Sequence, residues 1–304
     1  MLDLGIVIVN WNTRDLLEKC LRTVYASEGD FSYSVVVVDN ASTDGSADMV
    51  RERFPQAQLI ASHTNDGFPK GNNRGLRLLG FRGIGRVEQG APRYALLLNP
   101  DTEVPPDALW RMMQFMDARP EVGVAGPKLI MANGELDVAC RRGFPTPAVS
   151  FYHFSGLARV FPYSRRFGRY NMTFADPNED LEVDSVVGAY MQVRRECIDA
   201  VGLMDEAFFM YAEDLDWAYR IKDAGWKVWY HAAVTVYHRK RAASKQSARA
   251  QLEFWRAMLI FYRKHYRRRT PFWLHGPILL ALLLKGGRGL WHELRHPTPP
   301  NQNI

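Results

Sequence analysis

Polar groups that could bind a ligand follow three apolar segments in the first hundred residues. These groups are Asn10-Trp11-Asn12, Asp39-Asn40 and Asn99-Pro100-Asp101. The carboxylate of Asp39 can accept a hydrogen bond from the N–H group of a pyrimidine ring. The carboxylate of Asp101 is a hard oxygen ligand of the kind that divalent cations prefer, and such sites leave positions for substrate phosphates. Both aspartates also suit local roles, Asp39 as a helix cap or Asx-turn and Asp101 as a turn residue before Pro105, and these alternatives stay open.

Residues 65–75 are rich in glycine and asparagine and lead into a predicted helix at residues 70–79. A turn of this kind directs backbone N–H groups toward an anion, and Arg74 would add a positive charge. The segment has no Gly-Lys-Ser/Thr of a Walker loop, and residues 80–85 do not fit the dinucleotide fingerprint. The alternative is a tight connection without a ligand.

Three carboxylates, Glu213, Asp214 and Asp216, open a predicted helix at about residues 213–224. Trp217 and Ile221 lie three and seven residues after Asp214, so this face of the helix points to the body of the protein. Asp214 is therefore the best candidate to accept a proton in a cleft. The alternative is that the three charges complement the helix dipole.

His238 ends the last predicted strand. An imidazole together with a carboxylate suits a divalent cation, and Mn²⁺ tolerates nitrogen ligands better than Mg²⁺ does. A structural histidine is the alternative. The basic, Ser- and Ala-rich residues 239–245 that follow predict a lid over a diphosphate.

Strands and helices alternate through the first 125 residues. Apolar runs at residues 5–9, 35–38, 94–98 and 122–125 predict buried strands, with a shorter strand at 59–61. Between them lie predicted helices, the first capped by Thr13. This order predicts an α/β fold with a single doubly wound, mostly parallel sheet flanked by helices, in which ligands bind at the carboxyl ends of the strands.

Regularity is lower in the second half of the chain. Residues 141–180 lack a clear period, which favours a long, partly ordered excursion, and loops of this length in compact domains are often functional. Residues 226–230 and 234–238 predict two short strands, and residues 246–265 predict a long helix.

Composition and charge limit the class of protein. The chain has 304 residues, of which 47% are hydrophobic and 24% charged, and this excludes a disordered or collagen-like chain. Three scattered cysteines indicate thiols in a reducing compartment, and the N-terminus lacks the pattern of a signal peptide. We therefore expect a cytoplasmic location.

The C-terminal region joins a basic run at 263–269 to an apolar run at 271–284. The apolar run is shorter than the roughly 20 residues of a spanning helix. Basic residues beside Phe272 and Trp273 predict an interfacial anchor on anionic lipid rather than a nucleic-acid surface. A packing helix with a solvated basic face is the alternative.

Six motifs occur in the order in which a known family carries them. They are VIVNWN at 7–12, VVDNASTDGS at 37–46, NDGFPKGNNRG at 65–75, LLNPDT at 97–102, VGAYM at 187–191 and YAEDLDW at 211–217. Together they resemble family 2 glycosyltransferases of the GT-A fold, in the rhamnosyltransferase-like branch, over about residues 4–240.

The resemblance implies the chemistry. It implies inverting transfer of a sugar, rhamnose from dTDP-L-rhamnose, to a hydroxyl of a lipid-linked glycan in cell-surface polysaccharide synthesis, with Mn²⁺ or Mg²⁺ as cofactor. The implied donor-binding residues are Asn10, Trp11, Asp39, Asn65, Gly67, Asn73, Arg74 and Asn99.

The resemblance also implies the remaining roles. Asp214 corresponds to the catalytic base, and Asp101 and His238 to metal ligands. Asn99 stands at the first position of the Asp-x-Asp metal motif, so one carboxylate remains there and His238 gains importance. The implied acceptor side comprises Gly188, Ala189, Met191 and Glu213, and the implied diphosphate lid includes Arg239 and Arg241.

We expect a glycosyltransferase domain at residues 1–240, with a nucleotide-binding half (1–103) and an acceptor-binding half (104–240), and a helical membrane-associating extension at 241–304. The expected partners are a nucleotide sugar, a lipid-linked glycan and the inner face of the cell membrane, but no nucleic acid. Two alternatives remain: a UDP-sugar donor (glucose, galactose or N-acetylglucosamine), and a membrane-associated nucleotide-sugar-binding scaffold without transfer activity.

Overall fold

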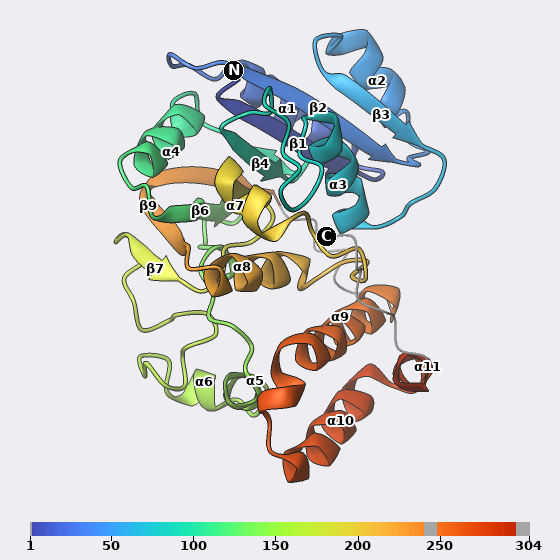
Figure 1. The fold of residues 1–304 in the computed structure, drawn as a ribbon, viewed down its shortest axis with the longest axis vertical. Helices are drawn as coiled ribbons and strands as arrows, with labels where there is room; N and C mark the ends of the chain where they lie inside the picture. Colours follow the sequence, from blue (N-terminus) through green and yellow to red (C-terminus); the bar gives the residue numbers. More distant parts are fainter. Residues whose placement is uncertain (1, 240–247, 296–304) are drawn as a thin grey trace.

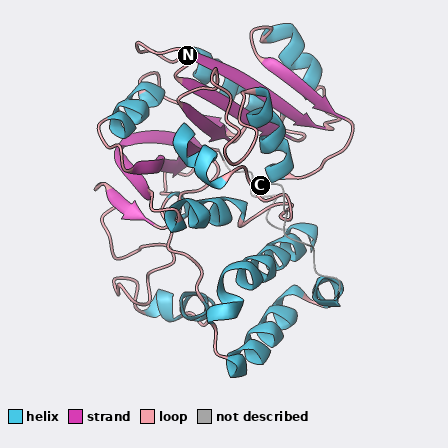
Figure 2. Ribbon diagram, in the orientation of Figure 1, coloured by secondary structure: helices cyan, strands magenta, loops and turns pink. Residues whose placement is uncertain are grey.

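A nine-stranded sheet, in the order β3-β2-β1-β4-β8-β6-β9-β5 with β7 paired to β9, forms the centre of the fold. This is the architecture of a computed structural model, which describes residues 2–239 and 248–295. Helices cover both faces of the sheet, and a mainly helical region lies beyond it (Figures 1 and 2). The predicted single sheet flanked by helices is confirmed.

The N-terminal half of the sheet is parallel. It consists of β1 (Leu4–Asn10), β2 (Tyr33–Asn40), β3 (Gln58–Ser62) and β4 (Tyr94–Leu98). Strand β1 is buried along its whole length because β2 and β4 flank it and helices cover it, which explains its continuous apolar run. The connecting helices are α1 (Arg14–Tyr25), α2 (Ser46–Arg53) and α3 (Phe68–Leu78).

The other half of the sheet is mixed, which the sequence did not reveal. Strand β8 (Tyr190–Arg194) runs antiparallel to both β4 and β6 (Val122–Met131), whereas β6 and β9 (Lys227–His238) are parallel. The short strands β5 (Thr102–Glu103) and β7 (Leu181–Val183) pair antiparallel with β9. The two strands predicted at 226–230 and 234–238 are one strand, β9, whose register against β6 shifts after Pro127.

Helices α4 (Ala108–Asp117), α7 (Arg195–Val201) and α8 (Glu213–Asp223) pack around this half. The excursion at residues 141–180 is more regular than predicted, since it contains α5 (Pro147–Phe154) and α6 (Leu157–Val160), preceded by a 3₁₀ turn at Val138–Cys140. The hydroxyl of Thr146 caps α5 by accepting from the N–H of Val149 at 3.2 Å.

The C-terminal region forms a helical unit. It comprises α9 (Ala248–Phe261), a π-helical turn (Tyr262–Tyr266), a 3₁₀ turn (Arg267–Arg269), α10 (Phe272–Gly286) and α11 (Arg288–Arg295). A second hydrophobic cluster, which includes Leu215 of α8 and Phe261 of α9, joins this unit to the sheet domain. Among residues 2–239 and 248–295, no helix is both long and apolar enough to span a bilayer.

Candidate functional site

Register between neighbouring strands brings the first two polar groups together. Asn10 pairs opposite Asp39 at the ends of β1 and β2, and its amide donates to Asp39 Oδ1 at 2.9 Å. The other carboxylate oxygen of Asp39 accepts from the N–H of Ser42 at 3.0 Å, which is the Asx-turn that the sequence left as an alternative. Asp39 therefore organises its own turn at the end of β2, while Trp11, just after the end of β1, is half exposed.

The backbone at this edge is strained. Asn12 and Ala41 have φ angles of 52° and 62°, in the left-handed region that non-glycine residues seldom adopt. The Oγ atom of Ser42 accepts from the N–H of Asn12 at 2.9 Å and from the Asn10 amide at 3.1 Å, so it holds the two turns together. Ser42 is a site residue that sequence reasoning missed, although it lies inside a quoted motif.

Thr13 does not cap helix α1 as predicted. Its hydroxyl donates instead to Asn10 Oδ1 at 2.6 Å, and no side-chain cap bond forms at this end. Both polar atoms of the Asn10 side chain are thereby fixed, which orients the amide toward Asp39.

The helix predicted at residues 70–79 is present and begins two residues earlier, so most of the glycine- and asparagine-rich segment is helical. Helix α3 begins at Phe68, so Asn73 lies inside it and exchanges two hydrogen bonds, of 2.8 and 3.0 Å, with the backbone of Met204. Asn65 closes the preceding turn by accepting from the N–H of Gly67 at 3.0 Å. Gly67 has a φ of 89°, and a Cβ atom there would meet the carbonyl oxygen of Phe209 at 2.5 Å, so only glycine fits.

Arg74 is already paired in the structure. Its guanidinium donates to Ser62 Oγ at 2.6 Å and to the carboxylate of Asp66. The predicted contact of Arg74 with a diphosphate therefore requires Asp66 to share or release it.

Pairing of β5 with β9 places Asp101 beside His238. Thr102 lies opposite His238, and Asp101 Oδ1 is 3.2 Å from His238 Nε2. On the far side, His238 Nδ1 is 2.9 Å from Asp137 Oδ2. Burial opposes protonation of the imidazole, but the hydrogen bonds to Asp101 and Asp137 outweigh it and raise the pKa of His238 above its usual value.

This arrangement fits a divalent cation that a substrate completes. When the N–H of His238 Nδ1 donates to Asp137, the lone pair of Nε2 faces the carboxylate of Asp101. Two such electron-rich atoms at this distance need a cation or a proton between them. Among the described residues, no group of three or more His, Cys, Asp or Glu side chains could hold a metal ion alone. The sequence analysis did not identify Asp137 as a partner of His238. The turn that follows β6 brings the two residues together, and no local pattern indicates this contact.

Asp214, at the start of α8, is buried and accepts three hydrogen bonds. Its Oδ2 accepts from Arg142 Nη2 at 2.6 Å and from the N–H of Gly188 at 3.0 Å, while Oδ1 accepts from the N–H of Leu215 at 2.7 Å. Arg142 lies in the excursion at residues 141–180, and the sequence contained no signal for its role.

The neighbouring Glu213 has the opposite character. Burial and the charge of Asp214 raise the pKa of Glu213 to about 8, and its Oε2 atom has no hydrogen-bond partner among the described residues. Glu213 is therefore mainly protonated at neutral pH. Tyr211 and Ala212, just before the helix, have φ angles of 74° and 60°, so the chain enters this site under backbone strain.

The residues expected on the acceptor side separate into two groups. The backbone of Gly188 contacts Asp214, and a Cβ atom there would meet the ring of Phe68 at 3.3 Å. Ala189 and Met191 have no exposed surface and lie in the core. As the structure stands, these two residues support the site and cannot touch an acceptor.

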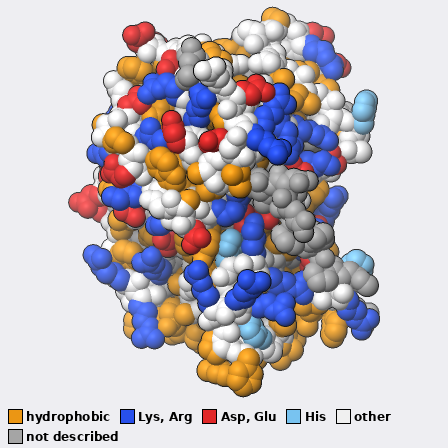
Figure 3. Space-filling view, in the orientation of Figure 1, with side chains coloured by type: hydrophobic (Ala, Val, Ile, Leu, Met, Phe, Trp, Pro, Cys, Tyr) orange, Lys and Arg blue, Asp and Glu red, His pale blue; other side chains and the backbone are white. Residues whose placement is uncertain are grey.

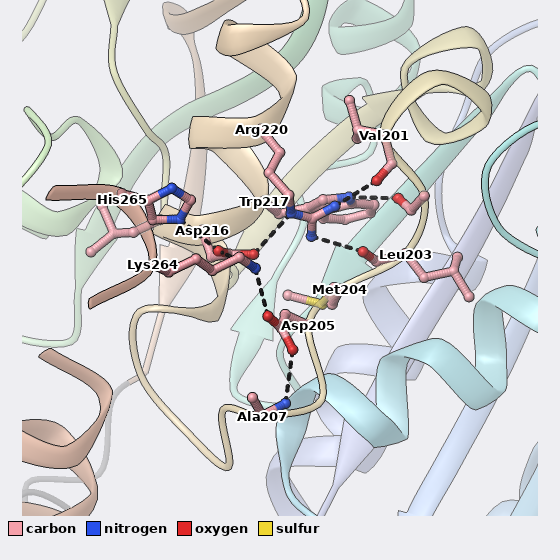
Figure 4. A network of polar contacts seen from close by, with 12 residues as sticks. Val201, Leu203, Met204, Asp205, Ala207, Asp216, Trp217, Arg220, Lys264 and His265 are labelled. Atoms are coloured by element: carbon pink, nitrogen blue, oxygen red, sulfur yellow. Dashed lines mark hydrogen bonds and ion pairs between the residues drawn. The ribbon is translucent and has the colours of Figure 1, made fainter. Parts of the chain in front are cut away.

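Asp216, two residues after Asp214, anchors a buried charge network (Figure 4). It accepts from Arg220 at 2.9 Å, from Lys264 at 2.7 Å and from His265 at 2.7 Å. Burial alone would raise the pKa of Asp216, but these three groups hold it well below its usual range. Lys264 also reaches the buried Asp205 at 2.5 Å.

This network corrects the prediction for the basic run at 263–269. Lys264 and His265 point into the protein, and Arg263 donates to the backbone carbonyl of Glu293 at 3.0 Å. The remaining part of the run, the 3₁₀ turn Arg267–Arg269, is exposed. The basic run thus divides between structural pairing and surface charge.

Arg239 is the only residue of the predicted lid, 239–245, that lies within the described part of the chain. Arg239 forms two contacts of 3.1 Å with the carboxylate of Glu103, and its N–H donates to the carbonyl of Asp101 at 2.7 Å. Arg241 and the rest of the lid lie outside the described residues.

A family model described as "Glycosyltransferase like family 2" matches residues 3–253. A curated relative, the N-acetylglucosaminyl-diphospho-decaprenol L-rhamnosyltransferase of Mycobacterium tuberculosis, is 27% identical over 237 residues, which are 78% of this chain and 76% of the relative. A low-salt glycan biosynthesis hexosyltransferase of Haloferax volcanii is 24% identical over 72% of this chain and 62% of its own length.

Solved structures show the same architecture. A mannosyltransferase from Pyrobaculum calidifontis in complex with GDP-Man and Mn²⁺ aligns with a TM-score of 0.57 and 18% identity, over 98% of this chain and 79% of that one. The S. aureus TarS structure (residues 1–349) aligns with a TM-score of 0.53 and 16% identity, over 84% of this chain and 63% of that one. At these identities the likeness establishes the fold alone.

Proposed function

This chain belongs to glycosyltransferase family 2, and we propose that it moves a sugar from a nucleotide donor to a hydroxyl group of a glycan with inversion at the anomeric carbon. The observation that carries the proposal is the hydrogen-bonded Asp214 beside Glu213, whose pKa is raised to about 8, at the start of α8. Neighbouring carboxyl groups in contrasting environments are typical of acid–base sites.

Asp214 is the proposed base. The acceptor oxygen forms a bond to the anomeric carbon while the bond from that carbon to the diphosphate oxygen breaks, and the nucleoside diphosphate leaves. The hydroxyl proton passes to Asp214. Among the described residues, Oδ1 of Asp214 accepts only from the N–H of Leu215, so it retains a lone pair for this proton.

The leaving diphosphate needs compensating charge. Asp101 and His238 are the proposed ligands of a divalent cation, Mn²⁺ or Mg²⁺, and Asp137 orients the imidazole. When bound, such a cation neutralises charge on the leaving group. The solved mannosyltransferase complex with Mn²⁺ supports a metal in this fold.

Donor binding is assigned to residues 1–103 and acceptor binding to residues 104–240. We propose Asp39, Asn10 and Trp11 for the nucleotide base, with Asn65, Gly67, Asn73, Arg74 and Asn99 forming or supporting the rest of the donor cleft. The M. tuberculosis relative is an L-rhamnosyltransferase, which supports rhamnose from dTDP-L-rhamnose as the transferred sugar. A UDP-sugar is the second candidate.

The acceptor is proposed to be lipid-linked, and the enzyme to act at the inner face of the cell membrane. The name of the same relative includes a diphospho-decaprenol carrier. Phe272 and Trp273 at the start of α10 are 86% and 62% exposed, next to the exposed turn Arg267–Arg269. Exposed aromatic and basic side chains together suit an anionic bilayer.

Thermal unfolding with dTDP-, UDP- and GDP-sugars, each with and without Mn²⁺, tests the proposal. A donor at about 100 times its Kd stabilises the folded state by about 2.7 kcal/mol. We expect dTDP-rhamnose with Mn²⁺ to raise the midpoint most and to release dTDP when an acceptor is present. A larger shift with a UDP-sugar would identify that sugar as the donor in place of dTDP-rhamnose. Binding without any transfer would favour the scaffold alternative, and no shift with any sugar would contradict the proposal.

A further inference from the structure

A surface cavity of about 790 Å³ lies in the excursion at residues 141–180. Helices α5 and α6 and the segment that follows them form its walls. The side chains that matter for its chemistry are Phe154, Arg159, Phe167, Tyr170 and Asn171. Apolar rings and polar groups thus share one cavity.

The cavity adjoins the proposed catalytic site, because Tyr170 lines the cavity on one side and contacts Arg142 on the other. The carbonyl of Tyr170 accepts from the N–H of Gly143 at 2.9 Å, and its hydroxyl lies close enough to interact with the guanidinium of Arg142. Arg142 in turn donates to Asp214 at 2.6 Å. A ligand that fills the cavity would therefore meet Tyr170 on the side of the proposed base.

The charge of the cavity is positive. Arg159 lines it, is exposed and makes no ion pair with any residue of the described ranges. His153 also lines it, and burial together with the charge of Arg159 lowers the pKa of His153, so this imidazole stays neutral at pH 7. No acidic side chain of the described residues lines the cavity. These features favour an anion such as a phosphate.

Exposed apolar side chains surround this part of the molecule. Phe151, Val160 and Phe161 of the excursion are 63%, 68% and 50% exposed. Helices α5, α6 and α10 lie at the same end of the molecule, opposite β1–β3 (Figure 1). Figure 3 shows hydrophobic side chains gathered at that end, with Lys and Arg side chains above them. An apolar chain that leaves the cavity would therefore remain in apolar surroundings.

We propose that this cavity binds the phosphate and the first prenyl units of a polyprenyl-phosphate-linked acceptor. Arg159 pairs with the phosphate, and Phe154 and Phe167 contact the prenyl chain. The sugar of the acceptor then extends past Tyr170 toward Asp214. The inference rests on the proposed function, because it identifies the lipid part of the acceptor used by the same active site.

Farnesyl diphosphate is a soluble probe for this site. Calorimetric titration of the full chain should show it binding at least tenfold more tightly than inorganic diphosphate, because the prenyl group adds apolar contact. Arg159→Gln should weaken farnesyl diphosphate binding by about tenfold or more, since a charge-assisted contact is lost. Arg165→Gln is the matched control, because Arg165 is exposed and does not line the cavity.

Two results would overturn the inference. One is equal binding of farnesyl diphosphate by the wild type and by Arg159→Gln. The other is equal competition by vesicles of phosphatidylglycerol, which would identify a headgroup site for bulk lipid. The thermal shift with a nucleotide sugar separates the two proposals. If that shift persists in Arg159→Gln and the wild type fails to bind farnesyl diphosphate, only the inference fails.

Discussion

The donor edge of the sheet and the N-terminus of α8 are built in different ways. At the donor edge, Asn10, Asp39 and Ser42 contact one another within neighbouring strand ends, mostly through neutral groups. At α8, Asp214 and Asp216 are buried carboxylates that pair with cations from distant segments. One region depends on strand register, whereas the other depends on the packing of the excursion and of the C-terminal helices.

On the proposed roles of the two regions, the difference separates donor recognition from proton transfer. Short polar turns at strand ends can hold a nucleotide with little buried charge. Proton transfer, in contrast, needs a carboxylate whose charge state is set by its surroundings. Lys264 and His265 lie beyond the family match at residues 3–253, so the surroundings of α8 depend on a segment outside it.

The largest effect is expected at Asp214. Asp214→Asn should lower the transfer rate by at least ~10²-fold, because the general base is lost, while donor binding persists. Release of the nucleoside diphosphate measures the transfer rate, and the donor-induced thermal shift measures donor binding. Asp223→Asn, at the exposed end of the same helix, is the control. Full activity of Asp214→Asn would contradict the assignment of Asp214 as the general base.

Lys264→Met tests whether α8 depends on the C-terminal segment. The variant leaves Asp216 and Asp205 without a shared cation, and breaking a buried pair costs about 3–5 kcal/mol. We expect urea unfolding to show a loss of this order, and little loss for Lys285→Met, whose side chain is exposed. Equal stability of the two variants would show that the network is dispensable.

Glu213→Gln should change the pH dependence of stability. The pKa of Glu213 is raised to about 8 in the folded state, so between pH 4.5 and 8 the folded protein binds more protons than the unfolded chain. Stability of the wild type therefore falls as pH rises through this window. The variant has no carboxyl group at this position and does not lose stability in this way. Its free energy of unfolding in urea should therefore rise relative to that of the wild type from pH 5 to pH 8. A pH-independent difference would contradict the assignment, and Glu52→Gln on α2 is an exposed control.

The smallest effect is expected at the donor edge. Asp39→Asn should weaken nucleotide-sugar binding by about tenfold, the value of one charged hydrogen bond, with little change in the rate from bound donor. Titration calorimetry and single-turnover transfer separate these quantities. Asp48→Asn, exposed on α2, serves as the control. A rate loss as large as that of Asp214→Asn would show that the donor edge also acts in the transfer step, contrary to the proposed difference between the two regions.

The family and the GT-A fold were predictable from the sequence and are confirmed. The strands of the parallel half could be located because buried strands read as continuous apolar runs. The antiparallel placement of β8 could not be predicted, because the direction of a strand leaves no mark on its own pattern. The helix predicted at residues 70–79 is present as α3, but its sequence does not show that Asn73 bonds to the backbone of Met204.

The sequence by itself determined which polar residues end the strands and in what order they occur. Neighbouring parallel strands then bring Asn10 and Asp39 together through register alone. The tertiary structure decided the charge environment of the site. Arg142, Asp137 and Lys264 reach their partners across 72, 101 and 48 residues of chain, and local patterns do not encode such contacts. The physical reason is that burial and charge pairing arise only when distant segments pack together.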